Sequence, residues 1–116
     1  MLFRPELPAY ARKMASDSVD ARIRFAIANR RLVQVRYRGS ARVAEPHDYG
    51  VLNGRERLFV FQISGVPRPG HTATGWRLLE LSEIDELTVL EDSFPGSRGD
   101  SHQDHYQWEI VYARVK

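Results

Sequence analysis

Apolar residues follow two different periods along the chain. Residues 1–17 show no period, and we interpret them as an N-terminal arm. From residue 19 to about residue 31, apolar side chains recur at helical spacing, and Asp17 or Ser18 can accept hydrogen bonds from the free amides of a helix start. This pattern predicts one helix, with its apolar stripe toward the core.

Phe25 lies nearly opposite that stripe on the predicted helix. Together with Ala21 and Ala28 it forms a second apolar surface, which we call the Phe25 face. We expect either the arm or another chain to cover it. The Phe25 face is therefore a candidate surface for a homo-oligomer or a protein partner.

After residue 31 the period changes to two, which is typical of strands with one buried face. Pro46 should end a strand or lie on an edge, because proline has no amide hydrogen to donate. Asn53 and Gly54 favour a two-residue hairpin turn, and residues 64–75 predict a long mobile loop. The predicted strands cover residues 32–38, 41–45, 49–52, 57–63, 76–81, 87–90 and 106–113.

These elements predict a mainly β fold with one N-terminal α-helix, arranged as a small bent sheet or barrel rather than a parallel α/β fold. With 116 residues the chain has room for one domain, which we place at residues 18–116. Zero cysteines exclude thiolate zinc sites, iron–sulfur clusters and a disulfide-stapled secreted fold.

The N-terminal sequence does not resemble a signal peptide, because two prolines and a glutamate interrupt its apolar residues. No apolar run approaches the roughly 20 residues that span a bilayer. We therefore expect a cytoplasmic protein without a membrane partner.

Charge is distributed unevenly, although the net charge is only +2. Residues 1–60 carry a net charge of +6 and residues 61–116 a net charge of −4. Seven arginines and no acid lie between residues 22 and 42, whereas six acids and no base lie between residues 80 and 92. The arginine block could bind anions, since each guanidinium offers a planar fork of donors. Alternatively, the two blocks face each other or are solvated faces.

Several segments in order resemble a WYL domain: a helix, then LVQVRYRG, RVAEPH with a following YG, RLFVFQ, WRLLEL, SEI and LTVL. This resemblance covers residues 19–94. It implies an Sm-like or SH3-like β-barrel, mostly bacterial, that senses nucleic-acid or nucleotide-like ligands in transcription regulation. The namesake tripeptide is replaced by Arg57, Leu58 and Phe59, and no helix-turn-helix precedes the helix. Regulation would then act in trans.

Ligand contact is expected at arginines and neighbouring aromatic rings. Arg36 and Arg38 share a strand face, while the family resemblance places basic residues at Arg42 and Arg77. The alternative for the latter two is a structural pair with Glu45, Glu80 or an acid of residues 83–92. Exposed aromatic rings could stack on bases, and the rings nearest to loops are those of Tyr49 and Trp76.

Enzymatic chemistry has weaker support in the sequence. A metal-dependent hydrolase could use His102, Asp104 and His105, with His47 and Asp48 or with His71. These residues match no metalloenzyme motif, and no serine lies in a nucleophile-elbow pattern. We therefore predict no catalytic residue, metal or cofactor.

The sequence thus predicts a non-catalytic domain that binds a phosphate-bearing ligand, either a nucleotide or a short single-stranded nucleic acid, through an arginine face. A protein-interaction module that uses the Phe25 face and the acidic block is the first alternative. A small metal-dependent hydrolase is the second.

Overall fold

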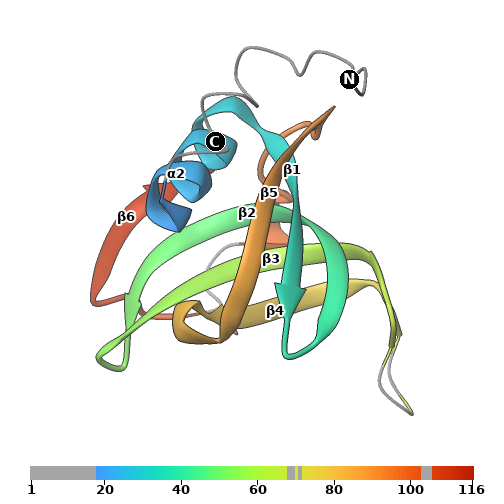
Figure 1. Ribbon diagram of the computed structural model, residues 1–116. Helices are drawn as coiled ribbons and strands as arrows, with labels where there is room; N and C mark the ends of the chain where they lie inside the picture. Colours follow the sequence, from blue (N-terminus) through green and yellow to red (C-terminus); the bar gives the residue numbers. More distant parts are fainter. Residues whose placement is uncertain (1–17, 68–69, 71, 103–105) are drawn as a thin grey trace, which may run out of the picture.

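The structure is a computed structural model that describes residues 18–67, 70, 72–102 and 106–116. The predicted arm, residues 1–17, lies outside the described residues. The fold is mainly β, with one N-terminal helix beside a six-stranded antiparallel sheet (Figure 1). This confirms the predicted fold class.

Helix α2 spans Val19–Asn29 and agrees with the predicted helix. The Ser18 side chain accepts a hydrogen bond from the Ala21 amide at 3.1 Å, which satisfies one of the free donors at the helix start. Arg30 ends the helix in a left-handed conformation with φ of 53°. The helix buries Ile23, Ala26 and Ile27 against the sheet, as the periodic stripe predicts.

The strands form the order β4-β3-β2-β1-β5, and β6 pairs with β2. Their bounds are β1 Arg31–Tyr37, β2 Ser40–Leu52, β3 Arg55–Gly65, β4 Gly75–Glu80, β5 Ile84–Ser93 and β6 Ile110–Arg114. Short 3₁₀ turns η1 and η2 occupy Leu81–Glu83 and Gly99–Ser101. The sheet is strongly bent but not closed, since no pairing joins β4 to β5 or β6 among the described residues (Figure 1). A bent sheet, and not a closed barrel, is therefore the architecture.

Of the two alternatives predicted for Pro46, the structure excludes a strand end and agrees with an edge position. Strand β2 runs through Pro46 without a break and pairs with β1 over residues 40–44 and with β6 over residues 48–51. Pro46 lies between these two partners, where the missing amide costs no ladder bond on that edge. Toward β3, the register shifts between Pro46 and Asp48, so His47 is the extra residue of a β-bulge.

The hairpin at Asn53 and Gly54 is confirmed. It joins β2 to β3, and its two turn residues have φ angles of 53° and 75°, as a primed turn requires. The terminal strand differs from the prediction, since β6 begins at Ile110 and not near residue 106.

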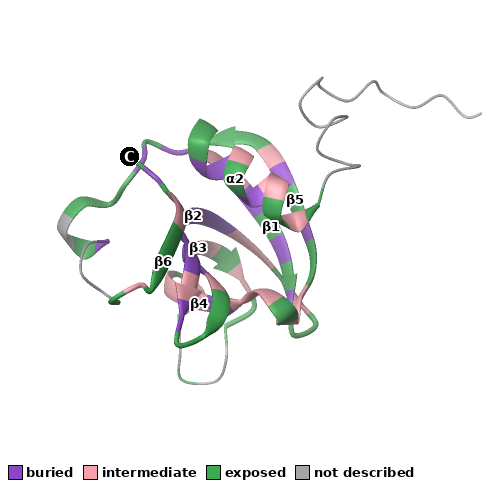
Figure 2. Cartoon of the chain, turned by 90° about the vertical axis from the view of Figure 1, so that its left-hand side faces the viewer, coloured by how far each residue is buried: buried purple, intermediate pink, exposed green. Residues whose placement is uncertain are grey.

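The main core lies between α2 and the concave side of the sheet (Figure 2). It contains alternate residues of β1 together with facing residues of β2, β3, β4 and β5; the largest fully buried ones include Tyr49, Leu58, Leu79, Leu87, Val33 and Val35. Phe25 is half-buried and packs against this core.

Candidate functional site

Four of the six predicted ligand-contact residues line one pocket of about 560 Å³, which we call the arginine pocket. The four are Arg38, Arg42, Trp76 and Arg77. Sequence reasoning missed several other residues of its wall, because they come from four strands and a loop: Tyr37, Ser40, Gln62, Val66, Pro67, Leu78 and Leu79. Among the described residues that line the pocket, none is acidic.

Arg38 lies at the mouth of the pocket, in the turn between β1 and β2. Its Nη2 donates to Glu83 Oε2 at 2.6 Å, and the Tyr37 hydroxyl donates to the same oxygen at 2.9 Å. These two donors hold the pKa of the Glu83 carboxyl below its usual value, with Arg38 as the larger cause. The charge of Arg38 is therefore partly neutralised in the unliganded protein.

Arg42 lies deeper, on β2. Its guanidinium carbon is 5.1 Å from the centre of the Tyr37 ring, and its Nη1 donates to Gln62 Oε1 at 3.3 Å. Gln62 is only 2% exposed and donates in turn to the Ala73 carbonyl at 2.7 Å. The glutamine thus orients Arg42 without cancelling its charge.

Arg77 on β4 completes the pocket. Its Nη2 donates to the Thr72 carbonyl at 2.8 Å and its Nη1 to the Trp76 carbonyl at 2.9 Å. The sequence analysis left open that Arg42 or Arg77 forms an ion pair with Glu45 or Glu80. In the structure, Glu45 pairs with Arg98 and Glu80 pairs with Arg55.

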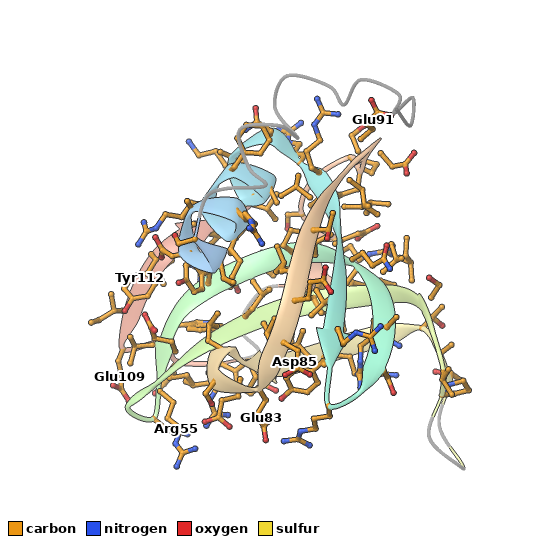
Figure 3. All side chains as sticks on the ribbon, in the orientation of Figure 1. Arg55, Glu83, Asp85, Glu91, Glu109 and Tyr112 are labelled. Carbon is orange, nitrogen blue, oxygen red and sulfur yellow. The ribbon has the colours of Figure 1, made fainter. Side chains whose placement is uncertain are left out.

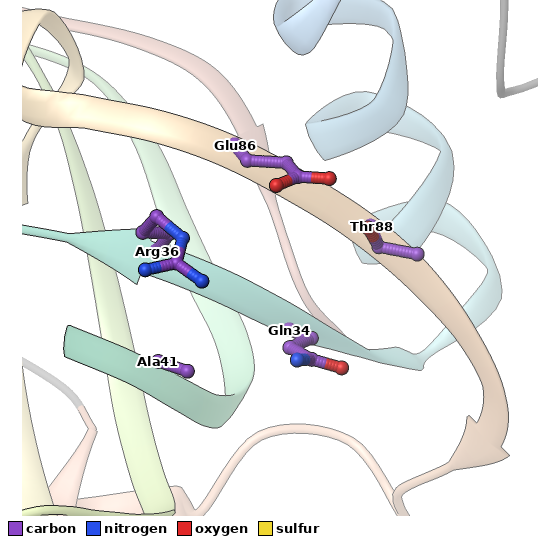
Figure 4. A pocket seen from close by; sticks show the side chains of 5 residues that line it. All are labelled: Gln34, Arg36, Ala41, Glu86 and Thr88. Atoms are coloured by element: carbon purple, nitrogen blue, oxygen red, sulfur yellow. The ribbon is translucent and has the colours of Figure 1, made fainter. Parts of the chain in front are cut away.

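Arg36 lies outside the arginine pocket. It stands on the exposed face of β1, opposite Ala41 and Glu86, beside a small hollow of about 90 Å³ (Figure 4). The expectation that Arg36 and Arg38 are presented together is wrong, because Arg38 leaves the strand with a positive φ of 50°. Residues beyond that point no longer follow the alternation of β1.

Tyr49 is 2% exposed, so the expectation that its ring is open to a stacked base is wrong. Its hydroxyl donates to Asp20 Oδ1 at 2.7 Å, and burial together with this bond raises the pKa of Tyr49 strongly. The alternation of β2 points the ring into the core toward α2. Tyr49 is therefore a structural residue.

Trp76 is half-buried, and its indole belongs to an aromatic cluster. It stacks on Phe59 at 4.6 Å between centroids and meets His47 edge-on at 4.8 Å. Phe61 also meets it edge-on. Its ring is thus engaged in packing.

The acidic block runs from the end of β4 through η1 and along the edge strand β5, so it is not gathered in one patch. Figure 3 places Glu83 and Asp85 at one end of this strand and Glu91 at the other. Part of the arginine block faces it, since Arg38 pairs with Glu83 and Arg31 donates to the Glu91 carbonyl. Only the first of these contacts joins opposite charges, because Arg31 bonds to the main-chain oxygen of Glu91 and not to its carboxylate.

A second polar group lies on the opposite face of β2 and β3, beneath residues 94–102. We call it the histidine cluster: His47, Asp48, Phe59, Trp76, Ser97 and His102. The bulge at His47 puts both Asp48 and Glu45 on this face, although odd and even positions of a regular strand face opposite ways. Burial lowers the pKa of His47, which is fully buried. The sequence analysis named His47, Asp48 and His102 together only as possible metal ligands; it did not find Ser97 or the aromatic packing, because no periodicity reveals the bulge that gathers these side chains.

The metal hypothesis falls partly outside the described residues, since His71, Asp104 and His105 are not among them. Within the described part of the chain, no group of three or more histidines and carboxylates could hold a metal ion. His102 and Asp48 do meet, as a hydrogen-bonded pair at 2.9 Å.

In the described residues, no helix is long and apolar enough to cross a membrane. No protein-family model, no curated protein and no solved structure matches this chain.

Proposed function

We propose that this protein is a ligand-sensing or regulatory domain that binds a phosphate-bearing ligand, a nucleotide or a short single-stranded nucleic acid, in the arginine pocket. The observation that carries the proposal is the meeting of Arg38, Arg42 and Arg77 around one hollow of about 560 Å³. That volume falls in the range of about 300–1,000 Å³ that small-molecule sites occupy.

Arg42 and Arg77 are the principal phosphate contacts in this proposal. Arg77 donates to two main-chain carbonyls and Arg42 to the Gln62 amide oxygen, and a phosphate would accept stronger, charge-assisted bonds from both guanidinium groups. Ser40 adds a hydroxyl, and Val66 and Pro67 offer exposed apolar surface for a base. Binding at this pocket requires no covalent chemistry.

The resemblance to WYL domains supports the same class of ligand, and the domain would act in trans in the cytoplasm. The order of segments over residues 19–94 carries that resemblance. A partner on the Phe25 face is the alternative. Size-exclusion chromatography with light scattering tests it, and a monomer that binds oligonucleotides favours the pocket.

The proposal is tested by titrating a fluorescein-labelled thymidine hexanucleotide and a labelled nucleotide at two salt concentrations. We expect Arg42→Ala with Arg77→Ala to weaken binding at least tenfold. The double variant should also flatten the salt dependence, because each neutralised phosphate of a single strand contributes a slope of about 0.7.

Arg36→Ala is the matched control. It removes the same charge from β1 outside the pocket, so a non-specific charge effect would weaken binding in this variant as well. The proposal would be contradicted if Arg36→Ala lost as much affinity as the double variant, or if the wild-type protein bound neither ligand.

A further inference from the structure

A continuous chain of hydrogen bonds joins Ser97, His102 and Asp48 in the histidine cluster. The Ser97 hydroxyl oxygen lies 2.6 Å from His102 Nδ1, and His102 Nε2 lies 2.9 Å from Asp48 Oδ1. The three residues come from β2 and from the segment after β5, so no local motif could reveal them. Nucleophilic serine chemistry uses this order of groups: a nucleophile, a base and a residue that orients the base.

The partners fix the tautomer of His102. Nε2 carries the proton and donates it to the Asp48 carboxylate, which also accepts from Arg114 Nε at 2.8 Å. Nδ1 then carries no proton, and its lone pair accepts a hydrogen bond from the Ser97 hydroxyl. A base with this geometry is ready to take the serine proton.

Of the three hydrogen-bonded residues, the nucleophile is exposed and the other two are buried, as access by a substrate requires. The side chains of His102 and Asp48 are 4% and 5% exposed, whereas Ser97 is exposed at the surface. The base is therefore shielded from bulk solvent, and substrate or a water molecule reaches it at the exposed Ser97 hydroxyl. The Gly99 amide donates to the Ser97 oxygen at 3.1 Å, which helps to hold the hydroxyl in place beside His102.

We propose that Ser97 is a nucleophile that accepts an acyl group from an uncharged carboxylic ester, with His102 as general base and Asp48 as positioning residue. Ser97 Oγ bonds to the acyl carbon as its proton moves to His102 Nδ1. The ester C–O bond then breaks, and the leaving alkoxide takes that proton from His102. Water reverses the sequence: its oxygen attacks, its proton passes through His102 to Ser97, and the carboxylic acid leaves.

A pair of aromatic rings begins beside His102: Phe59, which is 1% exposed and lies 6.5 Å away between centroids, and Tyr106, which meets Phe59 edge-on at 5.3 Å. Tyr106 is 40% exposed, so an apolar acyl group would contact the Tyr106 ring. Arg98, next to Ser97, is occupied by the Glu45 carboxylate. Trp76 is common to the arginine pocket and the histidine cluster, but Ser97, His102 and Asp48 do not line that pocket.

The same bonds would also fasten residues 94–102 to the sheet, so the test must separate reactivity from stability. The full chain is treated with a fluorophosphonate probe and the labelled peptide is identified by mass spectrometry. We expect label on Ser97, none on this peptide after Ser97→Ala, and a rate at least tenfold lower after His102→Gln. Ser101→Ala is the matched control, since Ser101 is exposed in the same segment but donates to the Arg98 carbonyl.

Asp48 is tested by rescue. Asp48→Asn should slow labelling at the same probe concentration, and Asp48→Glu should restore part of it, whereas a merely structural role predicts that labelling follows the melting temperature measured by circular dichroism. A burst of one equivalent of p-nitrophenol from p-nitrophenyl acetate, abolished by Ser97→Ala, would support the acyl step.

Three results would overturn the proposal: no label on Ser97 in the folded wild-type protein, equal labelling of Ser97 and Ser101, or an undiminished rate in a folded His102→Gln protein. If His102→Gln does not fold, the comparison of Ser97 with Ser101 in the wild-type chain decides. Arg42→Ala and Arg77→Ala should label normally, so failure here and failure of ligand binding are distinguishable.

Discussion

The two faces of β2 and β3 hold their polar groups in opposite ways. In the histidine cluster, Asp48 is almost fully buried and accepts hydrogen bonds from both His102 and Arg114. In the arginine pocket, Arg42 and Arg77 are half-exposed and donate to neutral oxygens. The charge of Asp48 is thus balanced inside the fold by two donors, whereas the neutral oxygens that accept from Arg42 and Arg77 lie at a half-exposed site.

This comparison predicts very different costs for removing one charge from each face. Asp48→Ala leaves His102 and Arg114 without their acceptor in a buried site, and should lower the free energy of unfolding by on the order of 3 kcal/mol. Arg42→Ala should cost less than about 1 kcal/mol, as substitutions outside the core usually do. Urea titrations of both variants check this, and equal costs would break the comparison.

The ion pair between Arg98 and Glu45 should have an intermediate cost. Arg98 donates from Nε and Nη2 to the two oxygens of a buried carboxylate, and its guanidinium lies 3.6 Å from the centre of the Phe61 ring. We expect Arg98→Ala to lower the free energy of unfolding by about 2 kcal/mol, because hydrogen bonds to charged groups are worth about 1.5–3 kcal/mol.

Arg98→Lys is the informative control. It keeps the charge but cannot form the two parallel bonds, so it should recover only part of the loss. Full recovery would mean that charge alone, and not the fork geometry, holds residues 94–102 on the sheet.

The arginine pocket and the histidine cluster also differ in how much of each could be predicted from the sequence. Local signals fixed the helix cap at Ser18 and the turn at Asn53 and Gly54, because capping and positive φ depend on neighbours in the chain. The basic residues of the pocket were also found. Their grouping was only partly correct, since the positive φ of Arg38 separates it from Arg36.

Sequence reasoning named His47, Asp48 and His102 as possible metal ligands, but it could not supply the packing of the histidine cluster. Its buried pair joins residues that are 54 positions apart, and the bulge at His47 changes which side chains share a face. The continuity of β2 through Pro46 has the same origin: it depends on which edge the neighbouring strands leave unpaired. Each of these features is set by tertiary pairing, which leaves no periodic trace.

Acid should weaken the histidine cluster through His47. Burial, the largest cause, holds the pKa of His47 below its usual value and the nearby His102 adds to this, while the Glu45 carbonyl and the charges of Glu45 and Asp48 oppose it. Since the unfolded chain then binds the proton first, the stability contributed by neutral His47 is complete above about pH 6.5 and is lost as pH falls toward the lower folded value.

The measurement is the free energy of unfolding at pH 7.5 and pH 5 for the wild type and for His47→Phe, which keeps an aromatic ring beside Trp76 and Phe94. The difference between the two slopes isolates His47 from every other titrating group. A wild-type slope no steeper than that of the variant would contradict the assignment.

Glu83, at the mouth of the arginine pocket, should have the smallest effect on stability when it is substituted. It also tests whether the pocket binds the ligand. The Glu83 side chain is 38% exposed and pairs with an exposed arginine, so Glu83→Gln should change the urea midpoint little. The substitution frees one guanidinium and removes a negative charge next to the proposed phosphate site. Affinity for the labelled hexanucleotide should therefore rise a few-fold at low salt, and the gain should shrink as salt screens the pocket. Glu91→Gln at the far end of β5 makes the same change in net charge away from the pocket, and it should leave affinity as it is. If both variants raise affinity equally, the ligand responds to the overall charge of the protein and the arginine pocket loses its special role.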